Sequence, residues 1–104
     1  MTMAKATLIF DQRDDLPNGV IIAQRVHRLA TPTPDAPHGY THRFHCGTRA
    51  GQTLVRFDNE TGKGDHVHLG DTEQPYTFTT VDQLLKDFEA AIQPYLGDSP
   101  CLKP

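Results

Sequence analysis

The sequence of 104 residues lacks the features of a membrane protein and of a disulfide-stabilised secreted protein. No apolar run approaches the ~18–20 residues that a membrane-spanning helix needs, and the apolar residues 7–10 are too few for the core of a signal peptide. The two cysteines, Cys46 and Cys101, match no zinc or thioredoxin spacing. We therefore expect a cytoplasmic protein that makes no membrane contact and in which Cys46 is a small buried thiol.

Strong basic charge is also lacking, because the formal net charge is −3 with the histidines neutral. Broad nucleic-acid binding depends on clustered lysine and arginine, so this charge argues against a general nucleic-acid-binding surface. A local basic patch stays open, since many basic residues fall in the central part of the chain: Arg25, His27, Arg28, Arg43, His45, Arg49 and Arg56. Protonation of histidines near pH 6 would make anion binding there sensitive to pH.

Alternating apolar and polar residues predict several strands. The expected strands cover residues 4–10, 20–29, 40–46 and 53–58, with short extended segments at 67–69, at a sheet edge, and 74–78. Pro17-Asn18-Gly19 predicts a tight hairpin turn, because Asn-Gly readily adopts positive φ. Three prolines make residues 31–39 an ordered connection rather than a helix or a central strand.

One C-terminal helix is expected from residue 80 onward. Thr80 and Gln83 form a capping box, and Pro94 ends or kinks the helix. Its apolar stripe comprises Val81, Leu84, Leu85, Phe88, Ala91 and Ile92. The predicted fold class is therefore α+β, a curved antiparallel β-sheet of four to six strands covered by one C-terminal α-helix. A single domain would span residues 1–96, and residues 97–104 would form a flexible tail.

Residues 58–70 stand out as a long polar loop between two strands. They contain three acidic residues, two histidines, one lysine and three glycines. Hairpin loops usually have about 2–5 residues, so a longer loop with many ionisable groups is a candidate for chemistry. A glycine-shaped turn with no chemical role is the alternative. A nucleotide-binding P-loop is excluded, because its full spacing and its Ser/Thr are absent.

A histidine pair in this segment favours acid–base chemistry. His66 and His68 are two residues apart, so in an extended segment both imidazoles point the same way. Such a pair, or one histidine with Glu60, can accept and donate a proton near neutral pH. Lys63 and Arg56 could stabilise the charge that develops on a phosphate. This set suits metal-independent RNA cleavage by attack of the 2′-hydroxyl on the adjacent phosphate.

Metal binding is the second interpretation of the same histidines. His-x-His is a common half-site, and Asp65, His38 or His42 could supply a third ligand. Two histidines are weak evidence for a metal, so we predict neither a metal ion nor a cofactor.

Arginines on one sheet face allow an anion patch. Arg25, Arg43 and Arg56 could line such a face, although a solvated face with ordinary ion pairs explains them equally well. The nearby His27, His42 and His45 are expected to be structural strand residues rather than ligands.

Five segments, in order, resemble the TumE family, small proteins described as the toxin half of two-gene toxin–antitoxin modules. They are Lys5-Ala6-Thr7-Leu8-Ile9-Phe10, Pro17-Asn18-Gly19, Pro37-His38-Gly39-Tyr40, the run at residues 57–68 and Pro75-Tyr76-Thr77-Phe78. The resemblance extends from about residue 5 to residue 92. Its specific part is Asp-Asn-Glu-x-Gly-Lys-Gly-Asp-His-x-His at residues 58–68.

The resemblance implies a growth-inhibiting protein that is neutralised by an antitoxin-like partner of the helix-turn-helix type. The predicted function is a toxin-like ribonuclease that needs no metal. The catalytic candidates are His66, His68, Glu60 and Lys63, and the substrate-binding candidates are Arg56, Arg43, Asn59, Asp65 and Asp58. The acidic net charge argues against ribosome-dependent cleavage more than against the toxin role.

Two other functions stay open. One is a non-enzymatic interaction module that binds its partner through a sheet edge or the helix. The other is a metal-dependent hydrolase. The sequence leaves the oligomeric state undetermined, a dimer included.

Overall fold

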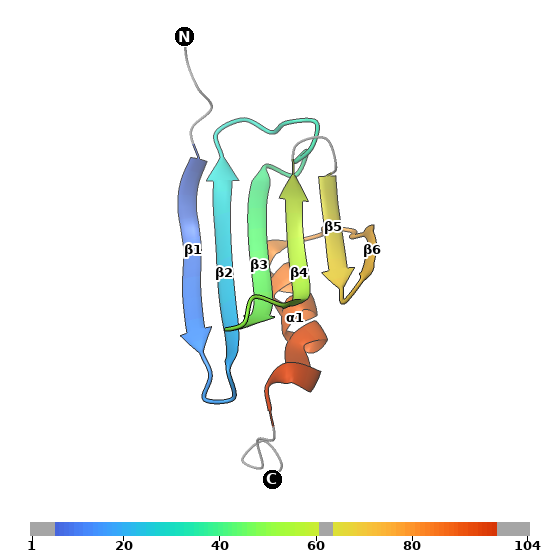
Figure 1. The fold of residues 1–104 in the computed structure, drawn as a ribbon. Helices are drawn as coiled ribbons and strands as arrows, with labels where there is room; N and C mark the ends of the chain where they lie inside the picture. The colour runs from blue at the N-terminus through green and yellow to red at the C-terminus, as the bar shows by residue number, and fades with distance from the viewer. Residues whose placement is uncertain (1–5, 61–63, 98–104) are drawn as a thin grey trace.

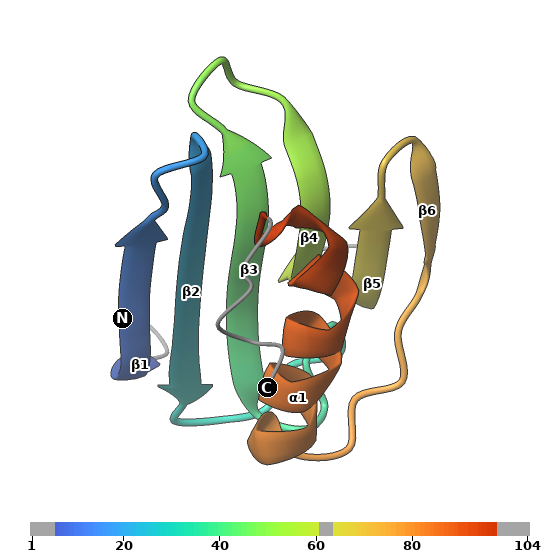
Figure 2. The same ribbon diagram turned by 90° about the horizontal axis from the view of Figure 1, so that it is seen from below.

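The computed structural model describes residues 6–60 and 64–97, apart from the side chain of Glu60. This part of the chain forms a six-stranded antiparallel sheet in the order β1-β2-β3-β4-β5-β6, with one α-helix against one face (Figures 1 and 2). The elements are β1 (Ala6–Asp15), β2 (Val20–Leu29), β3 (Tyr40–Thr48), β4 (Thr53–Glu60), β5 (Gly64–Leu69), β6 (Thr72–Pro75), α1 (Val81–Ile92) and a 3-10 turn (Gln93–Tyr95). The predicted α+β fold is confirmed. No helix in the described part is long and apolar enough to cross a membrane.

The core lies between the sheet and α1. Thr80 caps the helix, since its Oγ1 accepts a hydrogen bond from the N–H of Gln83 at 3.0 Å. The side chain of Gln83 donates to Asp87 at 2.8 Å instead of completing the predicted capping box. Phe88 reaches the sheet, with its ring 5.2 Å from that of Phe44 and 5.5 Å from that of Phe57. The other buried members of the core are Val20, Ile22, Val26, Cys46, Val55, Val67, Leu84 and Ile92. Cys46 is thus buried as expected, and burial raises the pKa of its thiol; Cys101 lies outside the described residues.

The β1–β2 hairpin confirms one prediction and corrects another. Its turn is where Asn18-Gly19 predicted it, with φ of +89° at Gly19. The first strand, however, runs to Asp15 instead of ending at residue 10. Its second half is polar and almost wholly exposed, so the hydrophobic pattern could not reveal it. Pairing with β2, in which Asp15 lies opposite Ile21, extends the strand.

Within residues 58–70, positions 58–60 and 64–69 belong to two paired strands, which corrects the prediction of a long polar loop. β4 continues to Glu60 and β5 starts at Gly64, and these two residues pair across the hairpin. Gly64 has a φ of +71°, which glycine adopts without the cost a side chain would add. The polar residues resembled a loop in sequence because many of them project from the sheet face opposite α1. Residues 67–69 also lie inside the sheet, since β6 pairs with the outer side of β5.

Candidate functional site

The sheet face opposite α1, here called the open face, carries two rows of polar side chains. These rows result from the register of the strands, because directly paired residues in antiparallel strands project to the same side of the sheet. One row contains Asp11, Arg25, Arg43, Asp58 and His66, and the next contains Arg13, His45, Arg56, His68 and Glu73. Residues far apart in the sequence therefore meet on one surface.

Five of these residues form a compact group, here called the open-face cluster. Nε2 of His66 lies 2.7 Å from Oδ1 of Asp58, and Nε of Arg56 lies 3.2 Å from Oδ2 of Asp58. Nη2 of Arg56 lies 2.9 Å from Nε2 of His68. Glu73 Oε2 is 3.5 Å from Nε2 of both histidines. Asp58 and His66 are buried, whereas the side chains of Arg56, His68 and Glu73 are 26%, 21% and 41% exposed.

Hydrogen bonding within the cluster is incomplete. Nδ1 of His66 lies 2.9 Å from the carbonyl oxygen of Gly64, so this nitrogen carries the proton and donates it. Both carboxylate oxygens of Asp58 and Nε2 of His66 lie close together, yet none of them has a partner with hydrogen-bond geometry. The groups are close enough for an ion pair when His66 is protonated, but they are not aligned as donor and acceptor. Buried polar atoms are usually paired, so these three make the cluster a candidate site.

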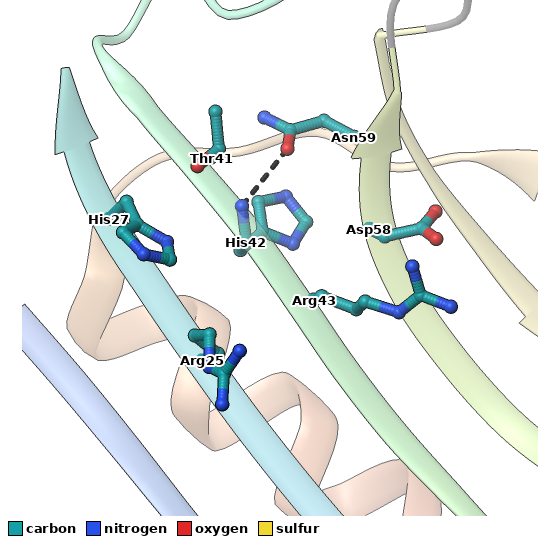
Figure 3. Close-up of a pocket in the computed structure, with 7 residues that line it drawn as sticks. All are labelled: Arg25, His27, Thr41, His42, Arg43, Asp58 and Asn59. Atoms are coloured by element: carbon teal, nitrogen blue, oxygen red, sulfur yellow. Dashed lines mark hydrogen bonds between the residues drawn. The ribbon is translucent and has the colours of Figure 1, made fainter. Parts of the chain in front are cut away.

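Basic depressions flank the cluster on the open face. One is lined by Arg25, His27, Thr41, His42, Arg43, Asp58 and Asn59 (Figure 3). In this view Arg43 extends from β3 toward Asp58, and Arg25 and His27 project from β2. A neighbouring depression shares Arg25 and Arg43 and adds His45. Burial, reinforced by the charges of Arg43 and Arg56, lowers the pKa of His45. The exposed side chains of Arg25 and Arg43 make these depressions candidate sites for an anion.

A second histidine–carboxylate group, the helix-side cluster, lies on the other face. Asp65 accepts hydrogen bonds from Nε2 of His38 at 2.9 Å and from Nε2 of His42 at 3.2 Å. Nδ1 of His38 accepts from the N–H of Tyr40 at 3.2 Å, and Phe78 stacks on the His38 ring at 3.8 Å. Burial lowers the pKa of His42, and Asp65 only partly opposes this. These satisfied contacts tie the connection between β2 and β3 to β3 and β5.

Asn59 joins β4 to the end of β3. Its Oδ1 accepts from the N–H of His42 at 3.0 Å (Figure 3), and its Nδ2 donates to the carbonyl oxygen of Tyr40 at 2.8 Å. The last backbone pair between these strands is Arg43 with Asp58. The amide of Asn59 therefore continues the strand pairing beyond that point.

A family model for the toxin TumE matches residues 5–96, nearly all of the chain. The chain belongs to the TumE toxin family. Membership supports a toxin-like role and suggests an antitoxin partner. The searches of curated proteins and of solved structures gave no match.

The structure divides the predicted site residues of this TumE-family chain between two faces. His66, His68, Arg56 and Asp58 meet in the open-face cluster, and Arg43 lies on the same face. Asp65 and Asn59 instead contact the helix-side cluster and the end of β3. Lys63 and the side chain of Glu60 lie outside the described residues.

The expected third metal ligands, Asp65, His38 and His42, are on the helix side, away from the His66–His68 pair. The acidic residues beside that pair are Asp58 and Glu73. Sequence reasoning missed Glu73, which lies opposite His68 in the pairing of β5 with β6. A prediction of strand pairing across residues 53–75 would have found it.

Proposed function

We propose that this TumE-family toxin cleaves RNA without a metal ion and that the open-face cluster is its active site. The observation that supports this most directly is the contact between Arg56 and His68 at the accessible end of the cluster. This contact places a fixed positive charge next to a titratable imidazole. Arg25 and Arg43 lie close by, where they would hold neighbouring phosphates.

The chemistry assigns different roles to the two histidines. Nε2 of His68 accepts from Arg56 and therefore has a lone pair. When Arg56 turns from His68 to the phosphate, this lone pair would remove the proton of the 2′-hydroxyl. The 2′ oxygen then bonds to phosphorus and the bond to the 5′ oxygen breaks. In its protonated form His66 faces acceptors at both nitrogens, Gly64 and Asp58. Because its Nε2 is buried, the bound substrate would have to displace Arg56 and Glu73 before His66 could donate a proton to the leaving oxygen. Arg56 would stabilise the charge on the phosphate.

The remaining predicted residues have supporting roles in this proposal. Asp58 would orient Arg56 and His66, which it contacts directly. Arg43 would bind the substrate backbone. Glu60 and Lys63 remain candidates as an alternative base and a phosphate contact.

Cleavage of a defined RNA by untagged protein in the presence of EDTA tests the proposal. His68→Ala should lower the rate by at least about 10²-fold, the low end of acid–base contributions. His45→Ala is the matched control, because His45 lies in the same row of the open face outside the cluster. A 2′-deoxy substitution at the scissile nucleotide should block cleavage. Absence of cleavage with or without ribosomes, or full activity of His68→Ala, would refute the mechanism.

A non-enzymatic interaction module is the second candidate, favoured by the exposure of β1. Among the described residues β1 pairs only with β2, so its outer edge is open, and Leu8 and Ile9 are 48% and 43% exposed. An open edge can accept a strand from a partner. The partner would be an antitoxin, and we propose one of the helix-turn-helix type.

Growth of cells that express the chain from a tightly repressed promoter separates these functions. The ribonuclease predicts that a folded His66→Ala/His68→Ala variant no longer arrests growth. The interaction module predicts that this variant still arrests growth, and that co-expressed antitoxin no longer neutralises Ile9→Lys on β1. Soluble expression of each variant is the control.

A further inference from the structure

We propose that Asp58, His66 and His68 form a binding site for a divalent transition-metal ion of the zinc type. Each residue offers one ligand atom, and the three atoms lie within 4.8 Å of one another. Two imidazole nitrogens and a carboxylate oxygen form the ligand set of many zinc sites. This set uses Asp58 from β4 and the two histidines from β5.

The first argument is the orientation of His66. Its Nδ1–H donates to the carbonyl oxygen of Gly64 at 2.9 Å, which leaves the lone pair of the neutral ring on Nε2. Metal-binding histidines usually donate their second N–H to a carbonyl or carboxylate in this way. Nε2 lies 2.7 Å from Oδ1 of Asp58 and therefore points into the proposed site.

The second argument is the unpaired state of the buried ligand atoms. Asp58 and His66 are 2% and 4% exposed, and both Asp58 oxygens and His66 Nε2 lack a hydrogen-bond partner. With His66 neutral, two lone pairs would face each other across 2.7 Å. A cation bound by both atoms would move them apart from 2.7 Å to the spacing of zinc ligands, remove this repulsion and satisfy both groups.

The third argument is that a positive group already bridges the same ligands. The guanidinium of Arg56 contacts Asp58 at 3.2 Å and His68 Nε2 at 2.9 Å. A metal ion would replace it at His68, and the partial exposure of Arg56 allows its side chain to turn toward solvent.

Glu73 lies beside the two histidine ligands, with its Oε2 3.5 Å from Nε2 of both His66 and His68. It is not a member of the three-residue set whose ligand atoms lie within 4.8 Å of one another. The proposed site therefore has three protein ligands, and a water molecule can take the fourth position of a tetrahedral zinc ion.

The helix-side cluster shows that the types of residue present do not by themselves make a metal site. It also contains two histidines and an aspartate, but both Nε2 atoms there make hydrogen bonds to Asp65. Nδ1 of His38 already accepts from the N–H of Tyr40. The Nε2 atoms of the helix-side cluster have hydrogen-bond partners, although Nδ1 of His42 has none, whereas Nε2 of His66 and both oxygens of Asp58 have none.

Metal binding would also regulate the proposed cleavage. This consequence, unlike the binding itself, rests on the proposed function. A metal ion on Nε2 of His66 and His68 would occupy both nitrogens that the cleavage needs for proton transfer. Zinc should then inhibit cleavage over the concentration range in which it binds.

Calorimetric titration of the untagged, EDTA-treated and desalted chain with Zn²⁺ tests the site. We expect one equivalent to bind, and the spectrum of a Co²⁺ complex should show tetrahedral coordination. Asp58→Asn, which keeps the side-chain shape, and His68→Ala should each weaken binding at least tenfold. His45→Ala should bind as the wild type does. Circular dichroism verifies that each variant is folded.

No zinc binding by the wild type would overturn the proposal, as would unchanged binding by folded Asp58→Asn and His68→Ala. Loss of binding in His38→Ala alone would also overturn it by moving the metal to the helix-side cluster. A chain that binds zinc but does not cleave RNA would keep the site and refute the ribonuclease. A chain that cleaves RNA in EDTA but does not bind zinc would keep the ribonuclease and refute the metal site.

Discussion

Asp65 and His66 are adjacent in the chain, but their side chains lie on opposite faces of β5. Asp65 accepts hydrogen bonds from His38 and His42 on the helix side, whereas His66 contacts Asp58 on the open face. The two clusters thus share a strand but none of these side-chain contacts. Substitutions in one cluster should therefore be distinguishable from substitutions in the other.

Asp65→Asn should destabilise the fold and leave the cleavage rate of the folded protein within about twofold. The substitution weakens charge-assisted hydrogen bonds to His38 and His42, each worth about 1.5–3 kcal/mol. Urea unfolding measures the loss of stability, and RNA cleavage in EDTA measures the activity. Unchanged stability together with slow cleavage would instead assign Asp65 to the substrate, as the sequence analysis predicted.

Acid should destabilise the protein through His42. Burial lowers the pKa of His42 in the folded state below the 6.5 of an exposed imidazole, so the unfolded chain binds the proton more readily. The contribution to stability is therefore fully present above pH 6.5 and is lost as the pH falls toward the folded-state pKa. His42→Gln keeps an amide that can donate to Asp65 but cannot titrate.

We expect the unfolding free energy of His42→Gln to fall less than that of the wild type between pH 7.5 and pH 5.5. His45 contributes in the same direction, since burial lowers its pKa as well. The measurement at pH 7.5 is the reference for each variant. Equal losses in the wild type and His42→Gln would show that His42 does not carry the effect.

The open-face arginines should give RNA binding a measurable dependence on salt. If Arg43 contacts one phosphate, Arg43→Gln should lower the slope of log K against log salt by about 0.7 for single-stranded RNA. Fluorescence anisotropy over a series of salt concentrations measures this slope. Arg28→Gln, a substitution on β2 outside both open-face rows, should leave it unchanged. The same decrease in both variants would indicate nonspecific attraction.

Local patterns were sufficient to predict α1 and β2. The capping residue Thr80 and the apolar stripe placed the helix, and the Asn18-Gly19 turn fixed the start of β2 at Val20. The last part of β1 is polar and exposed, and the paired ends of β4 and β5 are rich in polar residues, so both resemble loops in sequence. What makes them strands is pairing with their neighbours, which a local pattern does not contain.

The candidate site was predictable only in part for the same reason. A period of two placed His66 and His68 on one face, and this holds in β5. The contacts of Asp58 with His66 and of Arg56 with His68 depend on the register between β4 and β5. The same alternation places the side chain of Asp65 on the opposite face. Asp65 is next to His66 in the sequence, and we therefore predicted that both residues belong to one site.

Arg56→Lys should separate cleavage from metal binding. Lysine keeps the positive charge but lacks the planar fork that reaches Asp58 and His68 together. Cleavage in EDTA should therefore fall at least about tenfold. Zinc affinity should stay equal or increase, because the guanidinium no longer competes for His68. A parallel decrease in cleavage and in zinc affinity would mean that Arg56 stabilises the ligands rather than competing with the metal ion.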